Sequence, residues 1–503
     1  MAATPDAFDD ARQNHTRRLI ERDAVARLFA ADHTLWQSDP AECANRLGWV
    51  DEPVRQRTAG SNHATIRAAA DEIDEIVWCG MGGSSLFPEL IARSPLPRRP
   101  SPDFTVLDSS HPAPVARLLA RPRSDRRLYV VASKSGGTIE TRSHLETLTA
   151  ADPTAAVAVV TDAGSELDGL AANRGWMAWH ANPDIGGRFS AFSTFGMASA
   201  SLVGVEPLAL IEPAIEMNEL TRTSSAEGAA DLAAFLAAAH NVGRDKLTLL
   251  TPPSLDGFGA WVEQLVAEST GKSGIGILPV VDESPAAVDR YGADRCFVTY
   301  GAVSGVDAIR AGGHPVLDLG PIAAAGQLGA ELQRWMLATA LLGALLEINP
   351  FDQPDVESAK RSARAVLEGA APDSPPMGDP AALLATLAPG DHVVLQAFVD
   401  PDGDIPTHLG ALRTRLRDRL GCAVTVGIGP RYLHSSGQLH KGGPNSGIFI
   451  QIVETGDDDV AIPGREYGFS RLLRAQADGD YAALGSAGRR IVRASLASVL
   501  ACD

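Results

Sequence analysis

The chain has very few lysines. Of its 44 basic residues only five are lysine, and the other 39 are arginine. Arginine therefore occupies nearly every position where a plain surface cation suffices. Each lysine is then a candidate for a position that needs a compact, rotatable ammonium. Four of the five lie in glycine- or serine-bearing segments typical of ligand loops or helix ends, namely Lys134, Lys272, Lys360 and Lys441. Lys246, at the start of an apolar strand, looks ordinary.

The chain also lacks the features of several large protein classes. Its five cysteines are scattered and form no CxxC pair, which suits a reducing cytoplasm and offers no zinc site. Its polar N-terminus shows no signal peptide, and its longest apolar run, Trp335–Leu346, is too short to span a bilayer. The net charge of −18 argues against a broad surface for nucleic acid or an anionic membrane. We therefore predict a cytoplasmic protein with neither partner, in which a local positive site binds any anionic ligand.

Strand-like apolar runs alternate with helical stretches along most of the chain. Residues 1–72 are helical in pattern, two α/β series follow over 73–204 and 205–368, and the proline-rich segment 369–380 is the best linker candidate. Residues 381–503 predict a further small α/β region that closes with a helix near 486–500. Strands that are apolar throughout and separated by helices indicate parallel sheets covered on both faces. The expected fold class is α/β, with two doubly wound parallel-sheet domains between N-terminal helices and the small C-terminal region.

A loop rich in hydroxyls and glycines follows one buried strand and precedes a helix. It reads Ser133-Lys134-Ser135-Gly136-Gly137-Thr138. The N–H groups and dipole of a helix N-terminus favour a phosphate, to which the hydroxyls can donate hydrogen bonds. An earlier turn, CGMGGSSL, offers Ser84 to the same sheet edge, where open parallel sheets bind ligands. Either turn alone fits a plain strand-to-helix turn with a serine cap, but the two together favour a phosphate ligand.

At this point the sequence resembles a known family. The segment SKSGGTIET is similar to the phosphate loop of the glucose-6-phosphate isomerase family, which is built from sugar-isomerase (SIS) domains. Further family segments follow in the family's order over about residues 76–360, namely GGRFSAFSTFG, QLVAESTGK and NPFDQPDVESAK. The segment YLHSSGQLHKGGPN and the tail FSRLLRAQADGDYAAL resemble the isomerase half of bifunctional transaldolase/phosphoglucose isomerases. The two sheet domains are then expected to be SIS-type. No transaldolase half is present here, and the fused relatives alone imply a functional link to a separate transaldolase.

Interconversion of an aldose and a ketose needs a base that carries a proton between C1 and C2. A helix over about 256–270, which Ser254 or Asp256 can cap, carries Glu268 among apolar neighbours and Gln264 one turn earlier on the same face. We expect Glu268 to be the base and Gln264 to contact the substrate. The alternative for Glu268 is a solvated surface glutamate, a description that suits Glu263 better.

The reaction also needs a cation that stabilises the enediolate oxygen. Arg188 follows Gly186 and Gly187, which allow the backbone to approach a ligand closely. The resemblance implies that Arg188 has this role and that Gly187 borders the substrate. Lys272 is equally well explained as a helix C-terminal cation and as a ligand residue.

Ring opening needs an acid and a base near the ring oxygen. Gln353 and Lys360 are two helical turns apart on one face, and the resemblance implies Lys360 at the ring oxygen. The alternative is a surface ion pair of Lys360 with Glu357 or Glu347. Glu140 suits the first turn of the phosphate-loop helix by its charge, and the resemblance adds a hydrogen-bonding role near the active site.

The histidine of the family pattern is the main departure. His314 alone lies between Glu268 and Lys360, and its surroundings do not match the family's histidine segment. Our order of preference for the ring-opening histidine is therefore His440, then His434, then His314. In the family this histidine comes from the neighbouring subunit, so the resemblance implies a homodimer that completes its site across the interface, with Lys441 beside His440.

The expected function is a cofactor-free and metal-free isomerase of glucose 6-phosphate and fructose 6-phosphate, in glycolysis and gluconeogenesis. A variant that also accepts mannose 6-phosphate stays open. The alternative from another class is a sugar-phosphate-binding regulator. A regulator would need the phosphate loop but not Glu268, Arg188 and Lys360 together.

Overall fold

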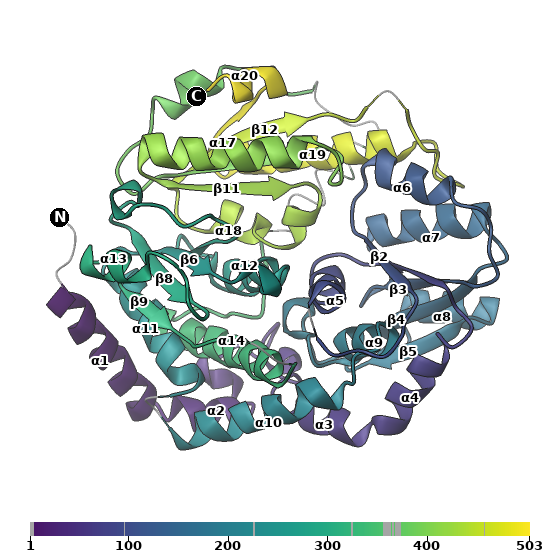
Figure 1. Ribbon diagram of the computed structural model, residues 1–503, viewed down its shortest axis with the longest axis horizontal. Helices are drawn as coiled ribbons and strands as arrows, with labels where there is room; N and C mark the ends of the chain where they lie inside the picture. The colour runs from purple at the N-terminus through teal and green to yellow at the C-terminus, as the bar shows by residue number, and fades with distance from the viewer. Residues whose placement is uncertain are drawn as a thin grey trace.

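Three parallel sheets organise the chain in the computed structural model (Figure 1). The structure describes residues 5–94, 96–224, 227–322, 325–355, 364, 367, 374–456 and 458–502. The first sheet has the order β2-β1-β3-β4-β5, and every neighbouring pair is parallel. Its strands are β1 (Glu75–Cys79), β2 (Asp103–Leu107), β3 (Arg127–Ala132), β4 (Ala156–Asp162) and β5 (Met177–Ala181). Its helices are α5 (Gly83–Arg93), α6 (Pro112–Leu119), α7 (Ile139–Ala151), α8 (Glu166–Arg174) and α9 (Thr194–Leu202).

The second sheet has the order β7-β6-β8-β9 and is also parallel throughout. Its strands are β6 (Lys246–Leu250), β7 (Leu278–Val280), β8 (Arg295–Thr299) and β9 (Val316–Asp318). Its helices are α10 (Leu208–Thr223), α11 (Ala229–Asn241), α12 (Phe258–Thr270), α13 (Val306–Ala311) and α14 (Ala325–Leu346). The apolar run that the sequence predicts to be a buried helix lies in α14, where Trp335 is fully buried. Among the described residues, no helix is long and apolar enough to cross a membrane.

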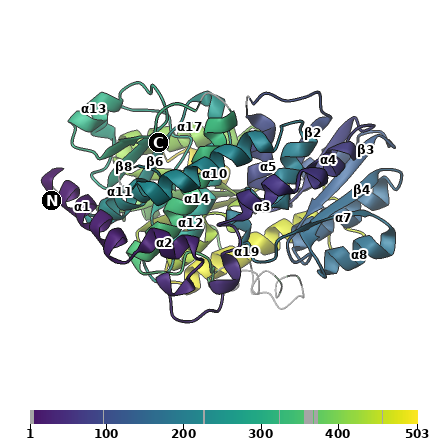
Figure 2. The ribbon, with the colours of Figure 1, turned by 90° about the horizontal axis from the view of Figure 1, so that it is seen from below.

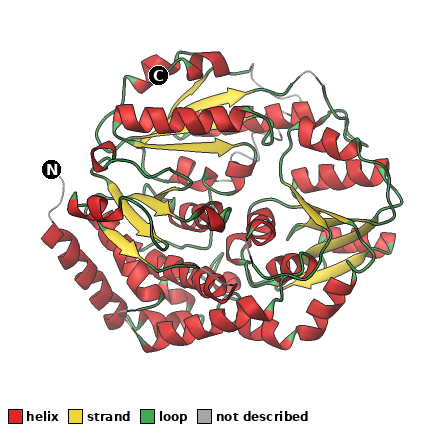
Figure 3. Ribbon diagram, viewed as in Figure 1, coloured by secondary structure: helices red, strands yellow, loops and turns green. Residues whose placement is uncertain are grey.

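The third sheet, which with its helices we call the C-terminal unit, has the order β11-β10-β12-β13. Its strands are β10 (His392–Phe398), β11 (Ala423–Ile428), β12 (Gly447–Val453) and β13 (Arg490–Arg493). Its helices are α16 (Pro380–Leu384), α17 (Ile405–Leu420), α18 (Gly437–Gly442), α19 (Phe469–Ser486) and α20 (Leu496–Leu500). The predicted fold class is confirmed, and Figure 3 shows helices around all three sheets.

One predicted element of the C-terminal unit is wrong. The sequence suggests a closing helix near 486–500, whereas α19 ends at Ser486 and β13 follows before the short α20. Gly488 turns the chain with a φ of 69°, which favours glycine. The apolar run Ile491–Val492 then pairs with β12 at the sheet edge, because that edge offers backbone partners that a helix would leave unused.

The N-terminal helices cover the second sheet unit and reach the first. They are α1 (Pro5–Glu21), α2 (Ala24–Phe29), α3 (Glu52–Thr58) and α4 (Gly60–Ala68). Phe8 of α1 meets Phe235 of α11 edge-on, with ring centroids 5.4 Å apart, in a core shared with α10, α12 and α14. Figure 2 shows α1, α2, α3 and α10 gathered on this face. Of the predicted linker 369–380, residues 374–380 are described; Pro380 begins α16, and Gly378 donates its N–H to the Arg493 carbonyl at 2.8 Å.

Candidate functional site

Helix α12 carries the predicted base, and it begins differently from the prediction. Neither Ser254 nor Asp256 caps it; the residue at its N-terminal boundary is Gly257, with a φ of 83°. Ser254 lies instead in a short 3-10 turn, Pro253–Leu255. Glycine at this boundary adopts the left-handed conformation at no steric cost, and it lies against the backbone of Leu90 on α5. The start of α12 is therefore set by close packing against α5.

Glu268 is held between two neighbours that are far apart in sequence. Gln264 Nε2 donates to Glu268 Oε2 at 3.1 Å, and Arg188 Nη1 lies 3.3 Å from Glu268 Oε1. The Glu268 side chain is 13% exposed, so it can be reached from solvent while both of its oxygens are oriented. Gln264 also donates to the His434 carbonyl at 2.8 Å. The shared helical face predicted for Gln264 and Glu268 is present.

Arg188 is buried and hydrogen-bonded on every side. It lies in a 3-10 turn, Gly187–Phe189, and donates from Nε to Ser269 Oγ at 2.9 Å and from Nη1 to Gln353 Oε1 at 2.8 Å. Its Nη2 donates to the carbonyls of Pro350 and Asp352, at 2.6 and 2.9 Å. Burial lowers the pKa of Arg188, while the Glu268 carboxylate opposes that shift. A guanidinium keeps its charge under such a shift, so a fixed cation faces Glu268.

Lys272 holds the segment that carries Gln353. Its Nζ donates to the Asn349 carbonyl at 2.6 Å, and to the carbonyl and the Oδ1 of Asp352 at 2.7 Å each. Burial, followed by the charge of Arg188, lowers the pKa of Lys272 to about 8. Lys272 follows Gly271 at the end of α12, so its ammonium bridges this helix to the 349–353 segment. Lys360, predicted at the ring oxygen, lies outside the described residues.

The predicted phosphate loop lies between β3 and the N-terminus of α7. Thr138 precedes the helix without making a side-chain cap, so its hydroxyl does not occupy the N–H groups of the first turn. Ser133 is buried and accepts from the Gly136 N–H at 3.2 Å, and Ser135 is exposed. Lys134 turns away, donating to Asp162 Oδ2 at 2.6 Å. Ser84, in the first turn of α5, is half-buried.

Glu140, in the first turn of α7, meets two residues of the C-terminal unit. Gln476 Nε2 donates to Glu140 Oε1 at 2.7 Å, and His434 Nε2 lies 2.9 Å from the same oxygen. Burial alone would raise the pKa of Glu140, but His434 lowers it, and the net direction is downward. Glu140 is therefore a buried carboxylate that is held in its charged form beside an imidazole.

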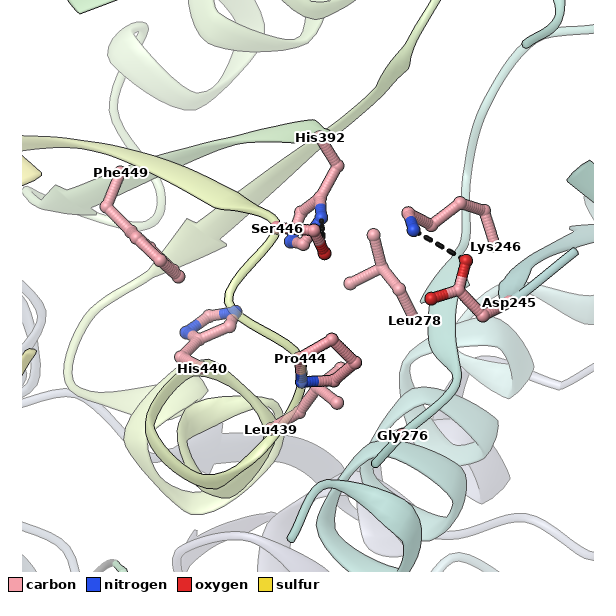
Figure 4. A pocket seen from close by; sticks show the side chains of 10 residues that line it. All are labelled: Asp245, Lys246, Gly276, Leu278, His392, Leu439, His440, Pro444, Ser446 and Phe449. Carbon is pink, nitrogen blue, oxygen red and sulfur yellow. Dashed lines mark hydrogen bonds and ion pairs between the residues drawn. The ribbon is translucent and has the colours of Figure 1, made fainter. Parts of the chain in front are cut away.

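His440 faces a different part of the molecule in this chain. It lies on α18 with its Nδ1 3.4 Å from Gln396 Nε2, and its ring packs against Tyr432 and Phe449. Figure 4 shows it with His392 and Ser446 at a cavity of about 10 Å³, across from Lys246 of the second unit. Burial, followed by the charge of Lys441, holds the pKa of His440 well below its usual range.

Lys441 and His314, the two remaining residues considered for ring opening or beside it, make their contacts elsewhere. Lys441 is buried and pairs with Asp480 of α19. His314 packs against Phe297 and Tyr291 next to Arg244, in the second sheet unit. Of the three candidate histidines, only His434 has hydrogen-bond contacts to Glu140 and Gln264 among the interactions of the described residues.

Sequence reasoning missed Gln476, Ser269 and Gln438. Gln438 Nε2 donates to the Gly271 carbonyl at 2.9 Å and to Asp355 Oδ2 at 2.6 Å, so it joins α18 to the end of α12. Gln476 and Gln438 are both buried. An amide on an otherwise apolar helix stripe, as in LLRAQA, is the signal that could have singled out Gln476. Within the described ranges, no cluster of His, Cys, Asp and Glu could hold a metal ion.

The fold agrees with solved structures of the same architecture. A hypothetical protein from Thermus thermophilus superposes with a TM-score of 0.60 at 25% identity, covering 71% of this chain and 97% of that one. A glucose-6-phosphate isomerase from Chlamydia trachomatis superposes with a TM-score of 0.56 at 18% identity, covering 71% and 86%. Fold and site together define an α/β protein in which parallel sheets surround a polar centre.

The sequence comparisons are more specific. The family model described as phosphoglucose isomerase matches residues 58–292. A glucose-6-phosphate isomerase from Synechococcus sp. (strain JA-3-3Ab) is 30% identical over a match that covers 58% of this chain and 66% of that protein, and one from Thermosynechococcus vestitus is equally similar. The chain thus spans 66% of the length of these curated relatives. The similarity to phosphoglucose isomerases thus rests on residues 58–292 and on sequence matches over 58% of the chain.

Proposed function

We propose that this protein interconverts glucose 6-phosphate and fructose 6-phosphate through an enediol, as an enzyme of glycolysis and gluconeogenesis. One observation carries the proposal: Glu268 is oriented by Gln264 and Arg188 and is connected through Gln264 and His434 to Glu140 at the phosphate-loop helix. A carboxylate, a fixed cation and an anion-binding helix end are the three parts that this reaction needs.

The phosphate binds at the N-terminus of α7. The helix dipole and the N–H groups of its first turn attract the anion, and Ser84, Ser133, Ser135 and Thr138 are the expected hydroxyl donors. Lys134 is bound to Asp162, so it contributes charge at a distance and not a direct contact. Gly187 leaves open space beside the cluster, with no atom within 4 Å of where a Cβ would lie.

Glu268 removes the proton from C2 of the open aldose and returns it to C1. The C–H electrons form the C1–C2 double bond, and the former carbonyl oxygen gains negative charge. When the proton returns to C1, the C2 hydroxyl gives its proton to that oxygen and becomes the ketose carbonyl. Arg188 stabilises that charge, with Gln353 beside it on the guanidinium. Because Arg188 is hydrogen-bonded to four neighbours, it needs no rearrangement as the charge develops.

His434 replaces His440 as our preferred ring-opening histidine. Its Nε2 lies 2.9 Å from Glu140 Oε1, and this contact orients the imidazole. Lys360 stays the expected donor at the ring oxygen, by the resemblance alone. Homodimer assembly, cytoplasmic location and a link to a separate transaldolase also stay predictions from the sequence.

A coupled assay tests the proposal. The purified chain with fructose 6-phosphate should generate glucose 6-phosphate without added metal or nucleotide. Glu268→Gln should reduce kcat by about 10³-fold or more while binding of a phosphate ligand is nearly kept, because the amide fills the same space but takes no proton. Glu216→Gln, at an exposed position on α10, is the control and should be fully active. Binding without turnover in the unmodified chain would support the sugar-phosphate-binding regulator instead. Turnover of mannose 6-phosphate is measured in the same assay.

A further inference from the structure

Both partners of Glu140 come from the C-terminal unit of the same chain. His434 and Gln476 contact the Glu140 carboxylate, and the His434 carbonyl accepts from Gln264, which in turn donates to Glu268. His434 is 294 positions from Glu140 in the sequence, yet a single copy of the chain brings them together. A neighbouring copy is therefore not needed to bring a histidine to this site.

We infer that each chain completes its own sugar-phosphate site, with Arg431 as the residue that positions His434 for ring opening. The inference rests on the proposed function, and it replaces the expectation that the histidine crosses a dimer interface. The C-terminal unit of each chain then supplies the ring-opening histidine to the site formed by the first and second sheet units.

Arg431 fixes the histidine segment to the first sheet unit. It begins the 3-10 turn Arg431–His434, pairs with Glu89 of α5, and places its Nε 3.4 Å from Asp108 Oδ2, just after β2. Burial opposes the charge of Arg431, but Asp108 and Glu89 raise its pKa above its usual value. Removing the Arg431 cation would leave the buried carboxylates of Glu89 and Asp108 without this partner, and such a loss is strongly destabilising.

The rest of the segment is fixed at both of its ends. Tyr432 donates its hydroxyl to Asp480 Oδ2 of α19 at 2.7 Å, and Ser435 donates to Glu263 Oε1 of α12 at 3.2 Å. The His434 backbone is also in close contact with Gly82, where a Cβ would lie 3.0 Å from the His434 carbonyl. His434 therefore has one position that satisfies all three units.

The same segment borders open space. A cavity of about 570 Å³ is lined by Glu89, Asp108, Glu263, Arg431 and Ser435, among others. If Arg431 lost its charge, the segment would have room to move away from Glu140. The Arg431 ion pairs therefore act together with the Tyr432 and Ser435 hydrogen bonds to keep the imidazole on Glu140.

Cross-linking tests the chain assignment without any need for activity. Arg117 of α6 pairs with Asp400 and Asp402 of the C-terminal unit, on the surface, and the five native cysteines are buried. The doubly substituted chain Arg117→Cys/Asp402→Cys is treated with a short bis-maleimide and run on a denaturing gel. We expect a cross-linked single chain, verified by a joined peptide of the two segments in the monomer band. A covalent dimer carrying that peptide would show that the C-terminal unit belongs to the neighbour's site and would overturn the inference.

Subunit mixing tests the same point through catalysis. Differently tagged Glu268→Gln and His434→Ala chains are co-expressed, and assemblies that carry both tags are isolated. If each chain uses its own histidine, activity on the ring-closed sugar stays at the level of the more active of the two single variants. If the histidine crossed between chains, one site in each pair would be intact and about half of the unmodified activity would return. Inactivity of the unmodified chain would refute the proposed function, whereas the cross-link would still decide the chain assignment.

Substrate choice tests the role of Arg431. His434→Ala and Arg431→Gln should each lose about 10²-fold in kcat on the ring-closed sugar and only a few-fold on an aldose phosphate too short to cyclise. Arg431→Lys should recover part of the loss, because it keeps the charge. A purely structural role would lower both activities equally and would show in the melting temperature. Equal losses, or full activity on the ring-closed sugar, would overturn the assignment.

Discussion

Gly83→Ala is expected to disable the site without touching a catalytic side chain. A Cβ built on Gly83 would lie 1.9 Å from the Gly187 carbonyl oxygen and 3.2 Å from the Arg188 nitrogen. Real Cβ contacts are essentially never below 3.0 Å, so the start of α5 and the turn that carries Arg188 must part by roughly 1 Å. Both neighbours are backbone, so no side chain can rotate to make room.

The magnitude follows from that displacement. A misplacement of about 1 Å at a catalytic group can cost ~10²-fold in rate, equivalent to ~2.7 kcal/mol of transition-state stabilisation. Overpacking costs about 1–3 kcal/mol in folding stability, which is less than the ~5–15 kcal/mol that keeps a domain folded. The variant should therefore be folded and slow.

The assay separates the two effects. Turnover of fructose 6-phosphate is measured together with unfolding in urea, and Gly169→Ala is the matched control. Gly169 lies in α8 with nothing within 4 Å of its Cβ position, so its variant should be fully active and equally or more stable. A Gly83→Ala protein with unchanged kcat/KM would refute the argument, because it would mean that Arg188 tolerates the shift. A rate loss that merely follows the unfolded fraction would refute it as well.

Two predictions concern stability. Burial raises the pKa of Glu263 to about 7, against a Ser435 hydrogen bond that lowers it. The folded state then keeps a proton that the unfolded state loses above about pH 4.5, so this group's contribution is present below that pH and is lost as pH rises to about 7. This contribution is at most about 3 kcal/mol. Glu263→Gln should reduce the pH dependence of the free energy of unfolding in urea between about pH 4.5 and 7. An unchanged pH dependence would contradict the assignment. Arg295→Ala should cost about 3–5 kcal/mol, because it leaves the buried Glu283, 3.0 Å from Arg295 Nη2, without its nearest cation. Adding Glu283→Gln should recover much of that loss in the same measurement, and a purely additive double variant would argue against the pair.

The local chemistry of the site could be read from the sequence because it depends on short spacings. Ser133, Ser135 and Thr138 lie in one loop before a helix, and Gln264 and Glu268 are one turn apart on α12. Such patterns fix a face or a loop whatever the rest of the chain does. The α/β class was predictable for the same reason, since apolar strands and helices alternate in order.

The start of α12 and the order of the last elements were not predictable in this way. Gly257 replaces a side-chain cap because α5 packs against it, and β13 forms because β12 offers an edge. Both outcomes depend on a partner that is distant in sequence. Local propensity is a weak guide wherever such a partner decides.

The sequence by itself determined the fold class, the hydroxyl- and glycine-rich loop before α7 and the helix that carries Glu268. Only the tertiary structure decided which histidine reaches Glu140, that Lys134 is bound to Asp162, and that Gln476 completes the site. His434 and His440 lie in one short segment, six positions apart, and their spacing gives no reason to prefer either. The choice follows from packing: α18 turns His440 toward Phe449 and Gln396, and Arg431 fixes the preceding turn so that His434 faces Glu140.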